Sequence, residues 1–230
     1  MKRIMSKLPK SPPLTRHYPM PFTRVELALM SIVEKRLVVL LGKRTEAPYQ
    51  GKWALPGGVL RIDLDRDLEA AAQRVAGERL GVGLPFLRQL KATGGATRDP
   101  RAPWALAIAY RALVPFAALD PQAGKRLEAI KWRPADEAAV DTTLAFDHAA
   151  LIGLALETTR REVHELDLPY GFLPEQFTLG ELQACCEAML GRSLDKSSFR
   201  RRLEERELLA PVPDGMRTGA FRPARLYRRR

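Results

Sequence analysis

The sequence predicts an α/β domain, in which helices cover a β-sheet, followed by a smaller domain of helices and a hairpin. Three observations indicate this order. A glycine turn precedes an amphipathic helix in the first third of the chain, and strand-like apolar segments flank that unit. Two helix-like segments followed by a basic hairpin close the chain. At 230 residues the chain is long enough for two domains of unequal size.

The positive charge of the chain is concentrated at its two ends. The net charge is +11, and residues 1–24 carry six lysines and arginines without an acid. Residues 192–230 carry twelve lysines and arginines against five acids. Residues 1–22 also hold five prolines, which predicts a basic tail that is either solvated or an arm on DNA. Basic ends around a neutral body indicate a polyanionic partner.

The cysteines and the apolar runs indicate the cellular compartment of the protein. Cys185 and Cys186 are adjacent, so neither is placed to form an ordinary disulfide, and no Cys/His cluster has zinc spacing. The apolar runs are broken by charges, and Met1–Lys10 lacks the apolar core of a signal peptide. We therefore expect a cytoplasmic protein that has no membrane segment, binds no metal and needs no cofactor.

The first part of the chain alternates strand-like and helix-like segments. Val25–Val33 and Arg36–Lys43 predict a hairpin because both are β-rich and a charged turn separates them. The further segments predict three strands and one helix, in the order Leu84–Thr93, Trp104–Val114, Leu127–Trp132 and Phe146–His164. Strands flanked by helices of this kind suit an α/β sandwich.

The segment from Ala54 to Val82 carries the most specific pattern. Pro56-Gly57-Gly58 predicts a turn, and the stretch that follows has apolar residues at helical spacing. Asp67 is expected to cap the start of this helix, and Gly81 to end it in a left-handed conformation.

This glycine-turn-helix unit resembles the Nudix box, which runs Gly, five residues, Glu, seven residues, then Arg-Glu-apolar-any-Glu-Glu-any-Gly-apolar. The chain keeps the positions of Gly58, Arg74, Glu78 and Gly81. The other acidic positions are replaced by Arg66, Val75 and Arg79, and the distance from Gly58 to Arg74 exceeds the pattern by two residues.

The resemblance implies that this Nudix box no longer binds metal or hydrolyses diphosphate bonds. Nudix enzymes hydrolyse diphosphate bonds with Mg²⁺ held by clustered carboxylates, and Mg²⁺ needs several hard oxygen ligands. Here Glu78 alone remains, and Arg66 and Arg79 bring positive charge. We expect a Nudix fold that binds a ligand without hydrolysing it. The alternative is a hydrolase that uses other carboxylates, for which the candidates are Asp63, Asp65, Asp67 and Glu69.

The C-terminal part predicts a winged helix-turn-helix. Residues 170–174 form a linker, and Thr178 and Glu181 have the spacing of a capping box at the start of a helix that Gly191 ends. A second helix is expected from about Leu194 to Leu209, then a turn-rich stretch over residues 211–219 and a basic strand over residues 220–230. Helix, turn, helix and basic hairpin follow in the order of that fold.

The second of these helices has the layout of a recognition helix. Phe199 and Leu203 lie on one face and Arg201 lies opposite, where it can reach base edges. A solvated charged face is the alternative interpretation. The predicted DNA-binding residues are Lys196, Ser197, Arg200, Arg201 and Arg202 on the helix, with Arg217, Arg222 and Arg225 in the wing.

Further segments extend the resemblance over residues 24–230. Trp53 to Gly58, Thr97 to Arg101, Trp132 to Pro134 and Ala145 to Ala149 resemble the Nudix-related transcriptional regulators of the NrtR-like family. That family joins a nucleotide-sensing Nudix domain to a DNA-binding winged helix. The predicted division is a tail over 1–22, a Nudix-like domain over 23–168 and a winged helix over 169–230.

The resemblance implies a repressor that senses ADP-ribose or a related nucleotide and controls genes of NAD metabolism or of sugar metabolism. We also expect a homodimer, because one recognition helix reads only a few base pairs and two of them can bind two half-sites. Expected effector-binding residues are Arg44, Tyr49, Trp53, Glu78 and Arg98. A module that binds RNA or protein through its basic ends is a further alternative.

Overall fold

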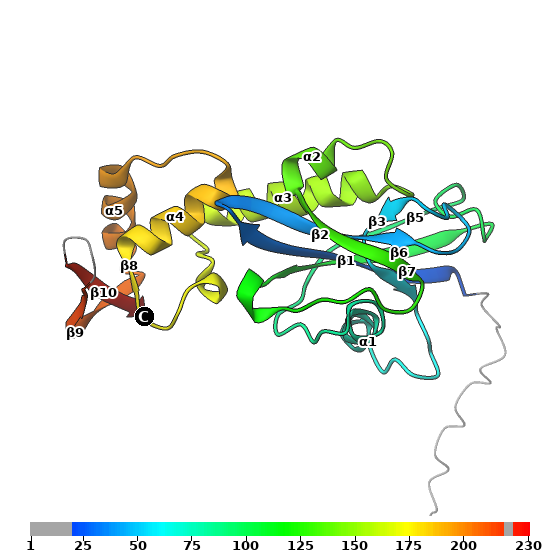
Figure 1. Cartoon of the computed structure of the whole chain (residues 1–230), viewed down its shortest axis with the longest axis horizontal. Coiled ribbons are helices and arrows are strands. Elements are labelled where there is room, and N and C mark those ends of the chain that lie inside the picture. Colours follow the sequence, from blue (N-terminus) through cyan, green and yellow to red (C-terminus); the bar gives the residue numbers. More distant parts are fainter. Residues whose placement is uncertain (1–19, 219–222) are drawn as a thin grey trace, which may run out of the picture.

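The computed structural model describes residues 20–218 and 223–230. In chain order its strands are β1 (Phe22–Val33), β2 (Arg36–Arg44), β3 (Trp53–Ala54), β4 (Gly57–Val59), β5 (Arg88–Gly95), β6 (Ala105–Leu113), β7 (Leu127–Pro134), β8 (Phe177–Thr178), β9 (Leu209–Arg217) and β10 (Ala224–Arg229). Its helices are α1 (Leu68–Leu80), α2 (Ala135–Ala139), α3 (His148–His164), α4 (Leu179–Leu190) and α5 (Lys196–Glu205), with short 3₁₀ turns at Phe116–Ala118 and Tyr170–Phe172. The molecule is elongated, with α4, α5, β9 and β10 at one end (Figure 1).

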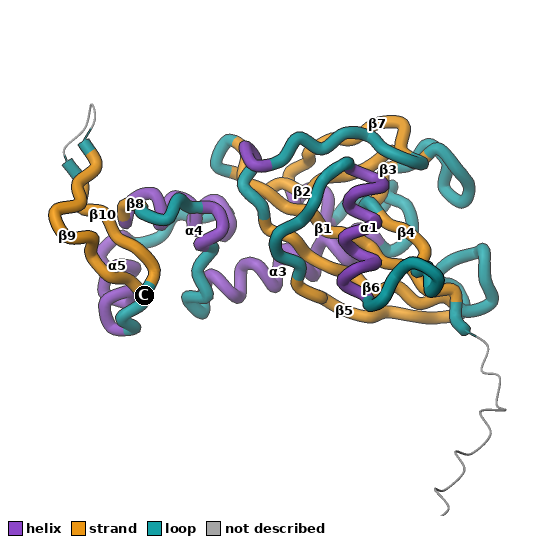
Figure 2. The backbone as a smooth tube through the Cα atoms, turned by 90° about the horizontal axis from the view of Figure 1, so that it is seen from below, coloured by secondary structure: helices purple, strands orange, loops and turns teal. Residues whose placement is uncertain are grey.

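The larger domain is built on a mixed sheet with β1 at its centre. Among the described residues the main order is β3-β2-β1-β6-β5, with β4 paired to β1 and β7 paired to β2. β1 runs antiparallel to β2 and β4 but parallel to β6. Helix α1 covers one face and helices α2 and α3 cover the other (Figures 1 and 2).

Alternation along β1 decides which side chains face which helix. Val25, Leu27 and Leu29 pack in one buried cluster with α1. Ala28 and Met30 pack in the other cluster with α3. Because strand side chains alternate, the even-numbered Arg24 and Glu26 also point toward the α3 face, and both are buried. An ionic pair therefore enters the core at the start of β1.

The predicted hairpin and the predicted caps of α1 are confirmed. Met30 pairs with Val39 and Val33 with Arg36 across the hairpin. The Asp67 side chain accepts from the backbone N–H of Ala70, and Gly81 ends the helix with φ 69°. The local signals of this part of the chain are strong enough to fix both ends of the helix.

Several boundaries in this domain differ from the prediction, and two of the differences have a local cause. The strand expected from Leu84 begins at Arg88, because the backbone N–H of Leu84 donates to the Gln73 side chain at 3.1 Å instead of to a neighbouring strand. The helix expected from Phe146 begins at His148, because Phe146 has a φ of +56°, which no right-handed helix accepts.

The smaller domain has the predicted winged helix-turn-helix order. Thr178 and Glu181 form the complete capping box of α4, and Gly191 ends that helix with φ 69°. Phe199 and Leu203 of α5 are buried, as their spacing predicted. A three-stranded sheet in the order β8-β10-β9 closes the described part of the domain.

Two expectations for this domain were wrong. The second helix spans Lys196–Glu205 and not 194–209, because Glu207 takes a φ of +48° and turns the chain out of the helix. The stretch expected to be turn-rich forms β9 as far as Arg217. It tolerates Pro211 and Pro213 because it lies at the edge of the sheet, where an N–H missing on the outer side breaks no ladder bond. The remainder of the predicted turn, from residue 219, lies outside the described residues.

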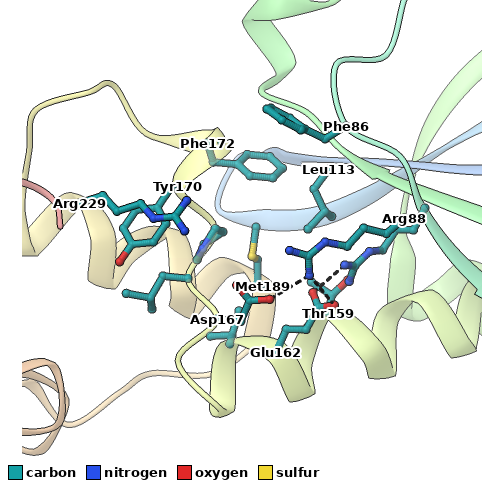
Figure 3. A pocket seen from close by; sticks show the side chains of 15 residues that line it. Phe86, Arg88, Leu113, Thr159, Glu162, Asp167, Tyr170, Phe172, Met189 and Arg229 are labelled. Carbon is teal, nitrogen blue, oxygen red and sulfur yellow. Dashed lines mark hydrogen bonds and ion pairs between the residues drawn. The ribbon is translucent and has the colours of Figure 1, made fainter. Parts of the chain in front are cut away.

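The two domains share a packed junction. The segment predicted as a linker packs Tyr170 and Phe172 against a buried cluster that runs from the sheet into α4 and α5. Beside it, Arg111 donates to Thr159 and Glu162. A cavity of about 240 Å³ remains there between the side chains of the two domains (Figure 3). Within the described ranges, no helix is long and apolar enough to cross a membrane.

Candidate anion pocket and nucleic-acid interface

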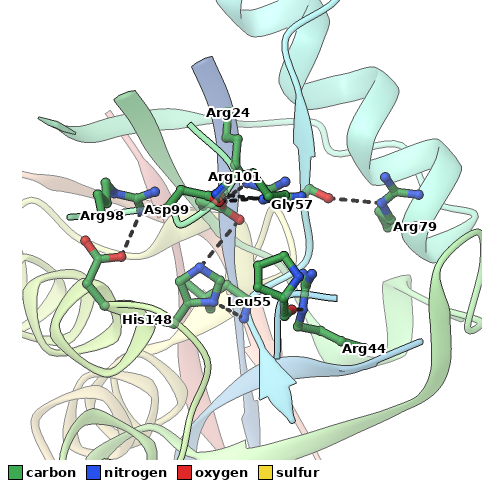
Figure 4. A network of polar contacts seen from close by, with 12 residues as sticks. Arg24, Arg44, Leu55, Gly57, Arg79, Arg98, Asp99, Arg101 and His148 are labelled. Atoms are coloured by element: carbon green, nitrogen blue, oxygen red, sulfur yellow. Dashed lines mark hydrogen bonds and ion pairs between the residues drawn. The ribbon is translucent and has the colours of Figure 1, made fainter. Parts of the chain in front are cut away.

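Five guanidinium groups gather beside the glycine turn. They come from β1, β2, α1, the β5–β6 loop and the segment before β7, and a small cavity of about 30 Å³ lies among them. These residues are Arg24, Arg44, Arg79, Arg101 and Arg126, and we call the cavity among them the arginine pocket; Glu46 is the single acid among its lining residues. Figure 4 shows Arg24, Arg44, Arg79 and Arg101. Such an excess of positive charge in a partly enclosed site favours an anion, above all one with several oxygens.

The aromatic ring of Phe146 organises three of these cations. The guanidinium carbons of Arg24, Arg44 and Arg101 lie 5.8, 5.1 and 5.9 Å from its centroid. Tyr49 meets the same ring edge-on at 4.7 Å. The ring face attracts cations and holds them side by side. Phe146 thus partly offsets the repulsion among these guanidinium groups.

Burial and neighbouring cations lower the pKa values of two of the five arginines. Burial, followed by the charges of Arg24 and Arg101, lowers the pKa of Arg44. Burial, followed by the charge of Arg126, lowers the pKa of Arg79. Both guanidinium groups remain charged at neutral pH, but the charged form of each is less stable here than in water. An anion placed among them would relieve that repulsion.

Two side chains at acidic positions of the Nudix box, those of Val75 and Arg79, stabilise the fold around the glycine turn. Val75 is buried and packs against Gly58, where a β-carbon would lie 2.7 Å from a Val75 methyl group. Arg79 donates from Nε to the carbonyl oxygen of Gly57 at 3.0 Å and from Nη1 to that of Lys125 at 2.8 Å. An apolar side chain and a cation therefore stand against the turn where the pattern calls for carboxylates.

Most of the remaining acids of this region are engaged elsewhere, whereas Glu69 is exposed on α1. Glu78 lies 3.4 Å from Arg74, which also forms an ion pair with Asp65 at 2.7 Å. Asp63 pairs with Arg61, and Asp67 caps α1. In the described parts of the chain, no group of three or more His, Cys, Asp or Glu side chains could hold a metal ion.

A buried ionic network lies behind the pocket. Arg24 donates from Nε to Glu26 at 2.8 Å, and neither side chain is more than 5% exposed. Burial is the largest single influence and would raise the pKa of Glu26, but the charge of Arg24, its hydrogen bond and the other nearby charges together lower the pKa below its ordinary value. The carboxylate of Glu26 also explains Gly57, since a β-carbon there would lie 1.8 Å from Oε2.

His148 closes this network from the start of α3. Its Nδ1 accepts from the backbone N–H of Leu55 at 2.9 Å, so the proton of the neutral ring is on Nε2, which lies 3.7 Å from Glu26. Burial lowers the pKa of His148 to about 4 against the opposing charges of Glu26 and Asp147. The imidazole is therefore neutral at physiological pH and ties α3 to the strand before the glycine turn.

The β5–β6 loop brings further charges to the network. Arg101 pairs with the buried Asp99, and Arg98 donates to Asp147 at 2.8 Å. The Nε and Nη1 atoms of Arg98 are buried without a hydrogen-bond partner among the described residues. Arg98 therefore retains unused donors close to the pocket.

The residues predicted to bind an effector are only partly brought together. Arg44 and Tyr49 meet at Phe146, whereas Arg98 lies behind them on Asp147. Trp53 carries Lys131 at 3.9 Å over its ring, and Glu78 points to Arg74, so neither lines the arginine pocket. Sequence reasoning missed Arg24, Arg79, Arg101, Arg126 and Phe146 as pocket residues. One signal was available, namely a charged Arg24-x-Glu26 pair inside an otherwise apolar strand.

On the opposite end of the molecule, α5 presents an exposed polar face. Lys196, Ser197, Arg200 and Arg201 are all exposed. Arg201 lies 3.6 Å from Glu205 one turn later, and both side chains are more than 60% exposed. Such an exposed pair is weak and can open toward a stronger anion.

Other residues predicted to contact DNA have different surroundings. Arg202 donates to the carbonyl oxygen of His164 at 2.6 Å. Arg217 donates to Glu181 at 2.8 Å and to the carbonyl of Gln176, and thus ties β9 to the start of α4. Arg225 is exposed on β10, whereas Arg222 lies outside the described residues.

Comparison with known proteins agrees with both halves of this architecture. A family model described as NUDIX domain matches residues 24–154, and one described as NrtR DNA-binding winged helix domain matches residues 169–229. The ADPR responsive transcriptional repressor NtrR of Acinetobacter baylyi is 36% identical over 211 residues, which are 92% of this chain and 83% of that protein. The chain belongs to the NrtR family.

Two solved structures of this family from Shewanella oneidensis are similar to the chain. NrtR complexed with a 27mer DNA is 33% identical with a TM-score of 0.73, and the match covers 90% of this chain and 93% of that one. The NUDIX domain of NrtR complexed with ADP ribose is 31% identical with a TM-score of 0.56, and the match covers 61% and 90%. The family and the fold class predicted from the sequence are confirmed.

Proposed function

We propose that this member of the NrtR family is a transcriptional repressor that binds an operator through α5 and the wing and is released when ADP-ribose occupies the arginine pocket. The observation that carries the proposal is the set of five guanidinium groups at the glycine turn of a Nudix domain. Relatives described as an ADPR responsive repressor, as bound to DNA and as bound to ADP ribose support it.

The pocket suits the diphosphate of such an effector. A diphosphate offers several charged oxygens, and guanidinium forks bind them in pairs. Arg44, Arg101 and Arg126 line the cavity from three different segments, so they can surround one anion. The ring of Phe146 contacts the guanidinium groups of Arg44 and Arg101, and Tyr49 packs edge-on against that ring.

The same domain is proposed to lack hydrolase activity. Mg²⁺-assisted hydrolysis requires carboxylates that converge on the diphosphate. Val75 is core, Arg79 donates to the turn, and Glu78 is paired with Arg74. Three of the four alternative carboxylates are engaged elsewhere, because Asp63 pairs with Arg61, Asp65 is held by Arg74 and Asp67 caps α1.

Operator binding is assigned to the exposed cations of the smaller domain. Arg201 faces away from the Phe199–Leu203 core and is proposed to contact bases. Phosphate contacts are assigned to Lys196, Ser197, Arg200 and Arg225. The proposed division of the chain remains 1–22, 23–168 and 169–230.

One recognition helix reads few base pairs, so we also propose a homodimer that binds two half-sites about one helical turn apart. Genes of NAD metabolism are the proposed targets. Sedimentation of the free protein and of its complex with DNA tests the stoichiometry, and a protein that stays monomeric in both would contradict it.

A binding experiment tests the proposed function as a whole. A duplex is first selected from a random pool for affinity to the full-length protein, and its binding is followed by fluorescence anisotropy. ADP-ribose should weaken binding of this duplex, whereas ribose at the same concentration should not, because it lacks the diphosphate. The proposal fails if the selected duplex stays bound at saturating ADP-ribose.

A further inference from the structure

Arg202 differs from the other cations of α5 in what it touches. Arg200 and Arg201 are exposed on the outer face of the helix, but Arg202 is half-buried and turns toward the larger domain. Its Nη2 donates to the carbonyl oxygen of His164, the last residue of α3, at 2.6 Å. This bond joins the proposed recognition helix to the helix that starts at the arginine pocket.

The carbonyl of His164 is suited to hold a cation. The last four carbonyls of a helix lack partners within it and carry the negative end of its dipole. At the end of α3, the carbonyls of Arg161, Glu162 and Val163 accept from the N–H groups of residues 165, 167 and 166. In the described part of the chain, Arg202 is the donor to the remaining carbonyl, that of His164.

Packing between the two helices is incomplete at this point. Val163 of α3 and Phe199 of α5 belong to one buried cluster, but both also line a hollow of about 210 Å³ between the end of α3 and α5. A charge-assisted hydrogen bond beside such a hollow adds to what fixes one helix relative to the other. The Arg202–His164 bond therefore contributes, together with the buried cluster, to the angle of α5 to the larger domain.

The other end of α3 lies at the arginine pocket. Phe146, two residues before α3, has a φ of +56° and touches three of the pocket arginines. His148, the first residue of α3, accepts from Leu55 beside the glycine turn. The helix has 17 residues and is thus about 25 Å long. An anion that draws the arginines together would displace the ring of Phe146, because three of them contact it. A displacement of Phe146 would shift the start of α3, and α3 would move as a rigid helix.

We infer that Arg202 is a positioning residue that transmits the state of the arginine pocket to the recognition helix through the end of α3. This inference rests on the proposed function. It names the contact through which the arginine pocket is coupled to the recognition helix. In the absence of an anion the Arg202–His164 bond holds α5 at the angle that fits the operator. Binding of the effector shifts α3 and strains that bond, so the angle no longer fits.

The test compares Arg202→Ala with Arg200→Ala in the full-length protein, using the selected duplex, a salt series and ADP-ribose. Arg202→Ala should weaken binding without effector about tenfold, and should reduce the further weakening by ADP-ribose to less than a third of the native factor. Its salt dependence should keep the native slope, because no phosphate contact is lost. Arg200→Ala should instead lower the slope by about one and keep the native response to ADP-ribose.

Rescue separates positioning from general destabilisation. Arg202→Lys keeps a cationic donor for the His164 carbonyl and should recover most of the response, whereas Arg202→Gln should not. This pair also replaces the alanine variant if that variant does not fold. The inference is overturned if Arg202→Ala lowers the salt slope as Arg200→Ala does, or if all Arg202 variants respond to ADP-ribose like the native protein. If the native protein itself is not released by ADP-ribose, the proposed function fails, not the role of Arg202.

Discussion

The Nε atom of Arg79 lies 3.0 Å from the carbonyl oxygen of Gly57 and donates a hydrogen bond to it. A cation thus occupies the side of the glycine turn at which the Nudix pattern places a carboxylate. Val75 fills the neighbouring position with a buried methyl group against Gly58. The turn at which the Nudix pattern would help to hold a metal forms one wall of the arginine pocket.

The first prediction concerns hydrolysis. ADP-ribose incubated with the protein and Mg²⁺ should remain intact, because no cluster of carboxylates is available to bind the ion at the turn. Chromatography of the nucleotide over hours, beside an active Nudix hydrolase as a positive control, measures this. Turnover of ~1 s⁻¹ or faster, the range of ordinary enzymes, would contradict the prediction.

The second prediction concerns the effector. Arg44→Ala and Arg126→Ala should each weaken ADP-ribose binding by about 1.5–3 kcal/mol, since each removes a charged donor from the anion. Arg36→Ala is the matched control, because Arg36 is exposed at the far end of the hairpin, where it pairs with Glu137. Isothermal titration calorimetry compares the three variants. Equal affinity of the Arg44 and Arg36 variants would place the effector elsewhere.

The third prediction separates base contacts from phosphate contacts. Arg201→Ala should cost about 1–3 kcal/mol on the selected duplex and little on random DNA. Arg225→Ala, in the wing, should weaken binding to both duplexes and reduce the salt slope by about one. Anisotropy titrations over a salt series measure both effects. The same loss for both variants on both duplexes would show that α5 is not the recognition helix.

The fourth prediction concerns pH. Burial lowers the pKa of His148 to about 4, whereas the unfolded chain has an ordinary imidazole near 6.5. Between these values the unfolded state binds a proton that the native state does not, so stability falls as the pH falls from 6.5 toward 4. The neighbours Glu26 and Asp147 oppose this shift, and Arg24 and Arg98 reinforce it.

Removal of the imidazole should flatten that dependence. His148→Gln keeps an acceptor for the Leu55 N–H but does not titrate. Between pH 7.5 and pH 5 the native protein should lose about 2 kcal/mol more than this variant. Urea unfolding at each pH gives the two curves. Parallel curves would mean that the pKa of His148 is not lowered in the native protein.

Local patterns in the sequence were enough to predict the elements whose ends are fixed by their own residues. Asp67 and Gly81 cap α1, and the Thr178–Glu181 box starts α4, because capping is decided within one turn of the chain. β9 was missed because its two prolines resemble a turn in isolation. Only the pairing with β10 shows that they lie on a sheet edge.

The candidate site was harder to predict because its members are distant in sequence. Arg24, Arg101 and Phe146 come from three separate segments, and their meeting depends on the parallel pairing of β1 with β6 and on the packing of α3. Arg202 shows the converse. Its position on α5 was predicted correctly, but its partner belongs to a helix of the other domain, which helical periodicity alone does not reveal.

The most direct measurement of the central claim is the linkage between the two ligands. Calorimetry gives the affinity of the full-length protein for ADP-ribose with and without the selected duplex, and anisotropy gives its affinity for the duplex with and without ADP-ribose. If the arginine pocket and α5 are coupled, both experiments must show weakening by the same factor, which we expect to be 5- to 150-fold. A factor of one in both experiments, with each ligand bound as tightly alone as together, would contradict the account.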